Sequence, residues 1–421
     1  MIKIVKRSDI GSILLKRKDS YGDIDKTVRR IVDDVRRYGD RALLKYRRLY
    51  DRIGTQGMII DKGRINRAVK GIDIRTKQAF ELAISRVTAF HELEKKHITS
   101  WNIRESGDIY YGEIFTPVER VGLYVPGGGA AYPSSVIMNA VPAVIAGVRE
   151  IYLATPMPND YVLAAAGMLG MNKVYSMGGA HAIAALAYGT CSVEKVDKIA
   201  GPGNRYVTLA KRLVYGDVGI DMVAGPSEVV VVADGSVNPS YVAADLMAQA
   251  EHDEHAMSVL ISLDRAYVGR VDKSMQVLLG YMSRKDTIKK SLKKNGFAVI
   301  ARDMEHAMDM ANIIAPEHLE LAVESPRAYL YHVRHAGAVF LGPYTPEVLG
   351  DYVAGPDHVL PTTGSARFSS GLGVYDFMKR TTVLEVGQNG FAKLAPHAEQ
   401  FGKVEGLDAH VQAASIRMKN D

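Results

Sequence analysis

The chain has 421 residues, of which 47% are hydrophobic and 24% charged, and it contains one cysteine. The length allows two or more buried cores, and the hydrophobic content excludes an intrinsically disordered chain. One cysteine excludes a disulfide framework and a four-cysteine metal site, and it is typical of a protein of the reducing cytoplasm.

The sequence predicts no membrane span and no secretory signal. Its longest strongly apolar stretch, Val136–Val148, contains Asn139 and Pro142 and is shorter than the roughly 18–20 residues that cross a bilayer. The first residues are basic, but no apolar segment follows them. We therefore expect a cytoplasmic protein with no membrane partner.

The net charge of +6 comes from the first 50 residues, which contain 15 Lys and Arg residues against seven Asp residues. There, basic side chains alternate with apolar ones at helical spacing, which is typical of the solvated face of an amphipathic helix. The alternative is a phosphate- or nucleic-acid-binding surface, but neither an aromatic-interleaved basic patch nor a recognition motif supports it. We expect no nucleic-acid partner.

The first 110 residues are predicted to be mainly helical, because periodic apolar positions run through Ile24–Asp51, Ile65–Lys70 and Asp73–Lys96. From Arg120 onward, short apolar strands alternate with short helices. The predicted strands begin at Val121, Glu150, Lys173 and Val196, and the predicted helices are Tyr161–Leu169, Ala180–Ala187 and Arg205–Val214. This alternation is typical of a parallel sheet that helices cover on both faces.

A second series of the same kind starts at Ser227. Its predicted strands are Val229–Val232, Met257–Leu263, Phe297–Ala301 and Val339–Leu341, and its predicted helices are Pro239–Glu251, Arg265–Met282 and His306–Ile314. A last strand, Thr382–Val386, precedes polar helical residues. We therefore predict an α/β fold: two doubly wound (Rossmann-like) α/β domains with a helical N-terminal region and a small extended C-terminal tail. Ligands of such folds bind at the carboxyl ends of the strands, commonly between the two halves.

Three glycine-rich turns follow predicted strands, at Pro126–Gly129, Gly178–Gly179 and Gly201–Asn204. Each leads to a predicted helix, whose first amides favour phosphate. None has the G-x-G-x-x-G pattern with a later acidic residue, so the dinucleotide fingerprint is absent. Any one of them is equally well a tight turn, but three on one sheet favour a nucleotide or phosphate ligand.

Nine of the 12 histidines lie at His252 or later. Gln249 and His252 are three residues apart at a helix end and share a face, so both could contact one metal ion. His252 and His255 have the same spacing and form a competing pair. A solvent-exposed helix end without a metal is the other interpretation.

Two further groups of polar residues carry titratable side chains. Adjacent Glu317 and His318 are typical of a proton-transfer pair, although a capping glutamate beside a packed histidine is an equal alternative. A polar loop contains Asp351 and His358, and Glu405 and His410 lie close to the C-terminal end.

The chain resembles the histidinol dehydrogenases, in which seven motifs occur in the same order and spacing. They are Tyr124-Val-Pro-Gly-Gly, Gly178-Gly-Ala-His-Ala, Gly201-Pro-Gly-Asn204, Ala224-Gly-Pro-Ser-Glu228, Gln249-Ala-Glu-His252, Pro316-Glu-His-Leu-Glu320, and Gly350-Asp-Tyr with His358-Val-Leu-Pro361. The resemblance runs from about Glu119 to the C-terminal tail, with a looser helical match before it.

The resemblance implies a zinc- and NAD-dependent enzyme that oxidises L-histidinol to L-histidine, the last step of histidine biosynthesis. It implies two NAD molecules used in succession, one zinc ion per subunit and a bound aldehyde intermediate. By the same resemblance, the catalytic residues are Glu317 and His318, and the zinc ligands are Gln249, His252, Asp351 and His410. The substrate contacts are these four ligands with Ser227, His318, His358 and Glu405, and the cofactor contacts are Tyr124, His181 and Asn204.

Two of these positions are unusual. Glutamine is outside the ordinary set of zinc ligands, so the choice of Gln249 rests on the resemblance alone. The family often has glutamine where this chain has His181.

The resemblance also implies a homodimer, because in this family the residues corresponding to Glu405 and His410 reach the partner's site. The predicted division is a mainly helical region 1–115 that packs on the second α/β unit, a cofactor-binding domain 116–226, a metal-binding and catalytic domain 227–375, and a dimerisation tail 376–421. Two enzyme alternatives remain at this point: a relative that oxidises another polar alcohol, and a zinc hydrolase in which Glu317 activates water.

Overall fold

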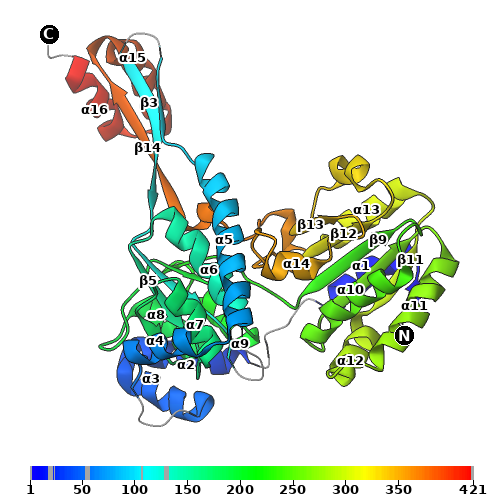
Figure 1. The fold of residues 1–421 in the computed structure, drawn as a ribbon. Coiled ribbons are helices and arrows are strands. Elements are labelled where there is room, and N and C mark those ends of the chain that lie inside the picture. Colours follow the sequence, from blue (N-terminus) through cyan, green and yellow to red (C-terminus); the bar gives the residue numbers. More distant parts are fainter. Residues whose placement is uncertain are drawn as a thin grey trace.

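The computed structural model describes residues 2–17, 22, 24–52, 57–105, 108–127 and 132–418. Two parallel sheets lie in separate lobes, which we call the five-stranded lobe and the six-stranded lobe (Figure 1). An arm of antiparallel strands and two helices projects away from both. The α/β prediction with parallel sheets is confirmed.

The five-stranded sheet has the order β6-β5-β4-β7-β8, and every neighbouring pair is parallel. Its strands are β4 (Arg120–Tyr124), β5 (Glu150–Ala154), β6 (Val174–Tyr175), β7 (Lys198–Ala200) and β8 (Gly219–Ile220). Its connecting helices are α6 (Pro133–Ala146), α7 (Asp160–Met168), α8 (Gly179–Tyr188) and α9 (Arg205–Val214). The first strand in sequence is central and the chain then winds in both directions, as in a doubly wound sheet.

The six-stranded sheet repeats this order as β11-β10-β9-β12-β13, with β1 added beside β11. Its strands are β1 (Lys3–Val5), β9 (Glu228–Ala233), β10 (Met257–Ser262), β11 (Phe297–Ile300), β12 (His318–Ala322) and β13 (Ala338–Leu341). Its helices are α1 (Arg7–Arg17), α10 (Pro239–His252), α11 (Arg265–Leu279), α12 (Lys285–Asn295), α13 (Met304–Ile314) and the 3-10 helix η3 (Pro326–His332). We did not predict β1, β12 or α12.

The N-terminal region divides differently from the prediction. Only β1 and α1 join the six-stranded lobe, where they contact β11 and α13. The following helices contact α8, α7 and α6 of the five-stranded lobe; they are α2 (Asp25–Tyr38), α3 (Asp40–Tyr46), the π-helix η2 (Arg47–Asp51), α4 (Lys62–Gly71) and α5 (Ile74–Lys96). The apolar face of α2 is buried in one hydrophobic cluster with α8, which explains this placement.

The arm corrects two further predictions. The predicted mainly helical region 1–115 contains two strands near its end, β2 (Trp101–Arg104) and most of β3 (Ile109–Pro117). The tail is not simply extended, because β14 (Met378–Val386) pairs antiparallel with β3 along its whole length and is followed by α15 (Gln388–Glu405) and α16 (Asp408–Met418). The aromatic and β-branched residues of β3 favour a strand over a helix.

The segment between β13 and the arm contains α14 (Glu347–Tyr352) and the 3-10 helices η4 (Ser365–Arg367) and η5 (Val374–Phe377). It contacts both lobes: α14 lies against the six-stranded sheet (Figure 1), and η5 lies against α5 and α6. The Val374 N–H donates to the Glu94 carboxylate on α5, at 2.8 Å. This segment therefore links the two lobes.

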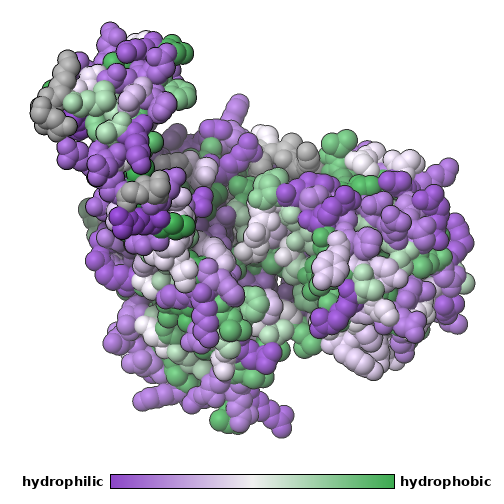
Figure 2. Space-filling view, turned by 90° about the horizontal axis from the view of Figure 1, so that it is seen from above, coloured by the Kyte–Doolittle hydropathy of each residue, from purple (hydrophilic) through white to green (hydrophobic). Residues whose placement is uncertain are grey.

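Hydrophilic side chains dominate the outer faces seen from above, and paler and more hydrophobic residues gather between the lobes (Figure 2). In the part of the chain that the structure describes, no helix is both long and apolar enough to cross a bilayer.

Candidate active site

The candidate catalytic residues Glu317 and His318 lie at the amino end of β12, beside the start of β9, where His318 is paired with Val229. In the six-stranded sheet, the predicted site residues therefore lie at the amino edge and not at the carboxyl ends, where we expected them. Gln249 and His252 reach the same edge because α10 begins beyond the carboxyl end of β9 and runs back for 14 residues, about 21 Å. The Ser258 hydroxyl at the start of β10 donates to the Leu246 carbonyl, so the last turns of α10 lie at the amino edge.

The backbone of Glu228 contacts both candidate catalytic side chains. Its N–H donates to Glu317 Oε2 at 2.9 Å, and its carbonyl accepts from His318 Nδ1 at 3.1 Å. Because a carbonyl only accepts, Nδ1 carries the hydrogen and Nε2 is the basic atom of His318. His318 Nε2 is buried and has no hydrogen-bond partner among the described residues.

Carboxylates surround the buried His318 ring. Its Nδ1 lies 3.9 Å from Glu317 Oε2 and 3.5 Å from Glu347 Oε2, and its Nε2 lies 3.6 Å from Asp351 Oδ1. Burial lowers the pKa of His318, but these three acids outweigh burial and raise the pKa well above its usual value. Burial in turn raises the pKa of Glu317 to about 7 and that of Glu347 to about 8.

Behind this pair lies a group of buried acids that we did not predict. Glu320, in the middle of β12, accepts from the Glu347 N–H at 2.7 Å. Burial and the neighbouring Asp245 on α10 raise the pKa of Glu320 well above its usual value, and burial raises that of Asp245 to about 6. The sequence did contain a signal for this group: Glu320 is a charged residue within an apolar run, and such residues are rarely buried without a partner. The same signal marks Glu228, whose motif we quoted without assigning it a role.

Three of the four predicted zinc ligands come from this edge. Gln249 is buried, and neither atom of its side-chain amide has a hydrogen-bond partner among the described residues. His252 follows it by one helical turn. Burial of Asp351 raises its pKa, but His318, His358 and His252 around it outweigh burial and lower the pKa below its usual value. A buried amide without a partner beside these donors fits a bound cation.

The predicted residues Glu405 and His410 lie elsewhere, on α15 and α16 of the arm, with exposed side chains. Figure 1 shows the arm pointing away from α10 and α14. Over the described ranges, no group of three or more His, Cys, Asp or Glu side chains is arranged to bind a metal ion. One subunit therefore supplies only part of the predicted ligand set.

His358 connects this edge to the five-stranded lobe. Its Nδ1 donates to the Asp351 carbonyl at 2.8 Å, and its Nε2 lies 3.4 Å from the hydroxyl of Ser135 near the start of α6. Ser227 directly precedes β9, and its carbonyl accepts from the Met257 N–H at 2.9 Å. The amino edge of one sheet thus meets a helix start at the carboxyl edge of the other.

The predicted cofactor residues lie at that carboxyl edge. The Tyr124 hydroxyl accepts from the Gly179 N–H at 3.1 Å, and burial raises its pKa to about 12. His181 is buried, and its Nε2 donates to Asp51 at 2.9 Å. The same carboxylate accepts from the Gly178 N–H at 3.0 Å, so Asp51 occupies an anion position at the start of α8.

Asn204 and Gly201 also have local structural roles. The Asn204 side chain accepts from the N–H groups of Tyr206 and Val207 and caps α9. Gly201 has a φ of 118°, and a Cβ there would lie 2.0 Å from the Tyr124 carbonyl oxygen. Two glycines of the first turn, 128 and 129, lie outside the described residues, and phosphate binding at these turns stays a prediction.

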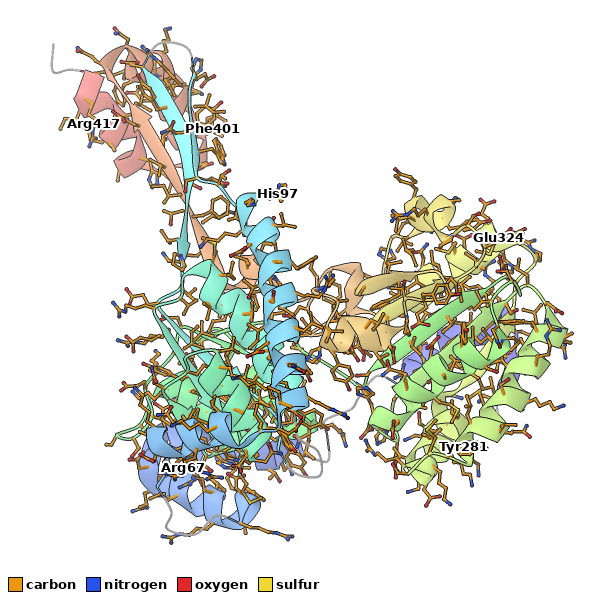
Figure 3. The ribbon with its side chains drawn as sticks, viewed as in Figure 1. Arg67, His97, Tyr281, Glu324, Phe401 and Arg417 are labelled. Carbon is orange, nitrogen blue, oxygen red and sulfur yellow. The ribbon has the colours of Figure 1, made fainter. Side chains whose placement is uncertain are left out.

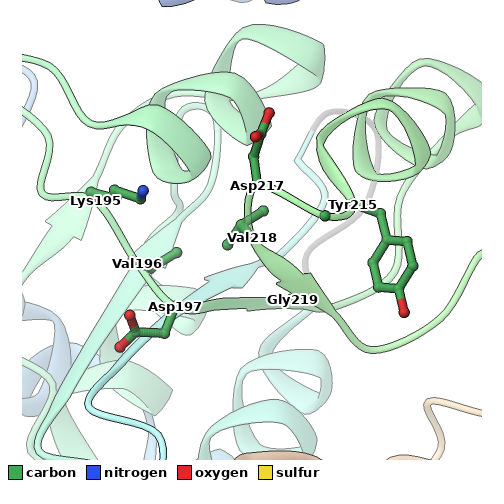
Figure 4. Close-up of a pocket in the computed structure, with 8 residues that line it drawn as sticks. Lys195, Val196, Asp197, Tyr215, Asp217, Val218 and Gly219 are labelled. Carbon is green, nitrogen blue, oxygen red and sulfur yellow. The ribbon is translucent and has the colours of Figure 1, made fainter. Parts of the chain in front are cut away.

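Two cavities lie away from these residues. One of about 380 Å³ opens at the amino ends of β7 and β8 and is lined by Lys195, Asp197, Tyr215 and their neighbours (Figure 4). The other, of about 520 Å³, lies between Glu94 and Asp376. Neither is lined by a predicted site residue.

Comparisons with known proteins agree with the motif resemblance. The sequence profile described as histidinol dehydrogenase matches residues 14–418. A histidinol dehydrogenase from Nitrosomonas europaea is 50% identical over 432 aligned positions, covering 99% of this chain and all of the relative. One from Dechloromonas aromatica is 49% identical, covering 94% of this chain and 93% of the relative.

A solved structure gives the same result. The crystal structure of histidinol dehydrogenase from Elizabethkingia anophelis is similar with a TM-score of 0.94 and 33% identity, covering 99% of this chain and 98% of that one. The predicted resemblance is confirmed, and the chain belongs to the histidinol dehydrogenase family.

Proposed function

We propose that this enzyme oxidises L-histidinol to L-histidine in two steps at the amino edge of the six-stranded sheet, with two NAD molecules and one zinc ion. The observation that carries the proposal is the double contact of the Glu228 backbone with Glu317 and His318. It leaves His318 Nε2 as a basic atom beside Asp351. A base and a second proton-accepting group in one buried place are what two successive oxidations of one carbon require.

The two residues have separate roles. In the first oxidation, His318 Nε2 takes the hydroxyl proton of histidinol and the product is the bound aldehyde. Glu317 then removes a proton from the water that adds to the aldehyde carbon, and the hydrate forms. In the second oxidation, His318 takes a hydrate hydroxyl proton and the carboxylate of histidine results. Overall one alcohol, one water and two NAD give one carboxylate, two NADH and three protons.

The residues that would bind NAD and zinc are assigned from the donor atoms of the chain. NAD accepts the hydride in each oxidation when bound, and zinc orients and polarises the substrate when bound. Gln249, His252 and Asp351 would bind the zinc ion together with His410 of the partner subunit. Tyr124, His181 and Asn204 would contact NAD, and Ser227, His358 and the partner's Glu405 would contact the substrate.

The proposed division follows the sheets. We assign the five-stranded lobe to the cofactor and the six-stranded lobe to the metal and the chemistry, as two doubly wound domains with the active site between them. The Ser135–His358 contact supports an active site at that position. A chain with one cysteine, Cys191, suits a reducing compartment, and we propose the cytoplasm.

A homodimer is part of the proposal because the arm is unsuited to solvent. Phe401 and Val404 on α15 are 71% and 76% exposed. Leu384 on β14 and Ile416 on α16 are also exposed, so apolar side chains occur on all three elements. Figure 3 shows Phe401 and Arg417 on this projecting unit. Exposed apolar surface of this kind marks a protein interface, and a second copy of the chain is the occupant that also delivers Glu405 and His410 to a site.

The first test is the number of NADH formed per L-histidinol consumed, with excess NAD and with or without a zinc chelator. We expect two NADH per substrate, loss of activity on chelation and recovery with added zinc. One NADH per substrate means that the aldehyde escapes and contradicts the role of Glu317. No NADH from histidinol, with NAD still bound, favours another polar alcohol as substrate.

The second test addresses the shared site. His252→Ala and His410→Ala homodimers are each expected to be inactive. Mixed dimers are expected to recover part of the activity, because one of their two sites collects intact ligands from both subunits. Mixed dimers that form but have no activity contradict the shared site.

A further inference from the structure

The catalytic residues are connected to the N-terminal helix by a buried ion pair. Arg17, the last residue of α1, places Nη1 2.6 Å from Glu228 Oε1 and 2.9 Å from the sulfur of Met257, and Nη2 3.3 Å from the His255 carbonyl. The side chains are 9% exposed for Arg17 and 1% for Glu228. A pair so shielded from water has a fixed geometry, unlike a surface ion pair.

The position of Arg17 is itself fixed by packing. Ile10 of α1 is fully buried in the hydrophobic cluster that contains α13 and the central strands β9 and β10. The preceding strand β1 pairs in parallel with β11, from Lys3 with Phe297 to Val5 with Val299. The guanidinium group therefore reaches Glu228 from a segment anchored to the same sheet.

Glu228 is the residue whose backbone contacts both catalytic side chains. Its N–H and its carbonyl belong to consecutive peptide groups, and a rotation of either one moves Glu317 or His318. The orientation of these groups depends on where the Glu228 side chain is held. Burial raises the pKa of this carboxyl group, and Arg17 lowers it. Without Arg17, neither the charge nor the position of the buried carboxylate is stabilised by an ion pair.

We propose that Arg17 is a positioning residue for the reaction: through its ion pair with Glu228 it holds the start of β9 so that Glu317 and His318 keep their catalytic orientation. The inference rests on the proposed function of these two residues. Arg17 touches neither of them and lies on the six-stranded lobe, apart from the predicted cofactor residues, so its loss should affect the chemical step and leave NAD binding in place.

The test compares three variants of the full-length, zinc-loaded enzyme. Arg17→Met removes the charge and keeps the length of the side chain, Arg17→Lys keeps the charge, and Lys16→Met is the exposed control on the same helix. We expect kcat to fall about 10- to 100-fold in Arg17→Met. The KM for NAD and the zinc content should stay within twofold of wild type.

The other two variants distinguish positioning from folding. Arg17→Lys is expected to restore part of kcat, and Lys16→Met is expected to equal the wild type. The inference is overturned if folded Arg17→Met keeps a kcat within twofold of wild type, or if the loss appears equally in the KM for NAD or in the zinc content.

A double-variant cycle covers the case in which Arg17→Met folds poorly. Glu228→Gln removes the buried charge, so the Arg17→Met/Glu228→Gln protein has no unpaired ion. We expect the double variant to fold and to lose no more kcat than Glu228→Gln alone. Losses that multiply instead contradict coupling through the pair. If wild type forms no NADH from histidinol, the proposed function fails; if it forms two and Arg17→Met matches it, only this inference fails.

Discussion

The two parallel sheets have the same strand order, but their predicted site residues lie at opposite edges. In the five-stranded lobe, Tyr124 ends a strand and Asn204 starts a helix, so both are at the carboxyl edge. In the six-stranded lobe, His318 starts a strand and His252 ends a helix, so both are at the amino edge. One topology therefore provides two electrostatically different surfaces.

The difference matches the charges of the proposed ligands. Helix starts present N–H groups and favour anions such as the phosphates of NAD. Helix ends present carbonyl groups and favour cations, and α10 ends at His252 beside Asp351. Bringing a carboxyl edge against an amino edge places a surface that favours anions opposite a surface that favours cations, which a site built from two carboxyl edges does not do.

The largest expected effect comes from replacing His318, which lies at the amino edge of the six-stranded sheet. Asn in place of His318 keeps a donor for the Glu228 carbonyl but removes the basic Nε2 atom. We expect His318→Asn to lower kcat by about 10²- to 10⁴-fold, as for loss of a general base, and to leave the NAD dissociation constant unchanged. Steady-state kinetics and calorimetric titration with NAD measure the two quantities. A comparable loss of NAD affinity contradicts the separation of the two edges.

The sequence named the candidate site residues but not the edge of the sheet at which they lie. Most strands and helices of both lobes follow from local periodicity, and the candidate pair Glu317 and His318 follows from a motif. Spacing shows which face of a helix two residues share, but the edge of the sheet depends on how far α10 runs back along β9. Strand β12 was missed because Glu320 interrupts its apolar pattern, and only Asp245 and Glu347, distant in sequence, explain that buried acid.

The arm was missed for a related reason. The pairing of β3 with β14 joins Ile109 to Val386, residues far apart in the chain. Local patterns contain no information on such a partner. The same holds for Arg17 and Glu228, whose contact depends on α1 joining the second sheet rather than the first.

The next largest expected effect is a change in the free energy of unfolding when Glu317, at the amino edge, is replaced. Burial raises the pKa of Glu317 from 4.5 to about 7 in the folded chain, so folding favours its protonated form. The stability from that form is complete below about pH 4.5 and is lost as the pH rises to about 7. Glu317→Gln, which stays neutral, should therefore stabilise the zinc-free protein at pH 8 by up to about 3 kcal/mol.

Urea unfolding of chelator-treated protein at pH 4.5 and pH 8 measures this difference. The gain should be absent at the lower pH, and the variant should be inactive despite it. If wild type and Glu317→Gln are equally stable at pH 8, the buried Glu317 carboxylate does not destabilise the folded chain. No such gain in stability at pH 8 is expected from substitutions at the carboxyl edge of the five-stranded sheet.

A smaller effect is the dependence of the rate on pH. Glu317 and His318 both act as proton acceptors in the proposed reaction and must be unprotonated. Their pKa values, raised in the metal-free chain, predict that kcat/KM increases from pH 6 to pH 8. The NAD dissociation constant, measured over the same range, is the control and should stay constant. A rate that is flat over this range contradicts the assignment of both bases.

The smallest expected effect tests the carboxyl edge. Asn204→Ala removes the cap of α9 and should cost about 1 kcal/mol of unfolding free energy. If Asn204 also contacts NAD, the KM for NAD rises while kcat at saturating NAD is unchanged. The matched control is Asp264→Ala, which removes an equivalent cap from α11 in the six-stranded lobe.

Both substitutions remove a side chain that accepts two backbone hydrogen bonds at a helix start, so their costs in stability should be similar. Only Asn204→Ala should change the KM for NAD. If the two variants have the same KM for NAD, Asn204 acts only as the cap of α9. In that case the electrostatic contrast between the edges depends on the helix starts themselves. The Gly178 N–H at the start of α8, which Asp51→Ala would free, is then the next candidate for binding the anion.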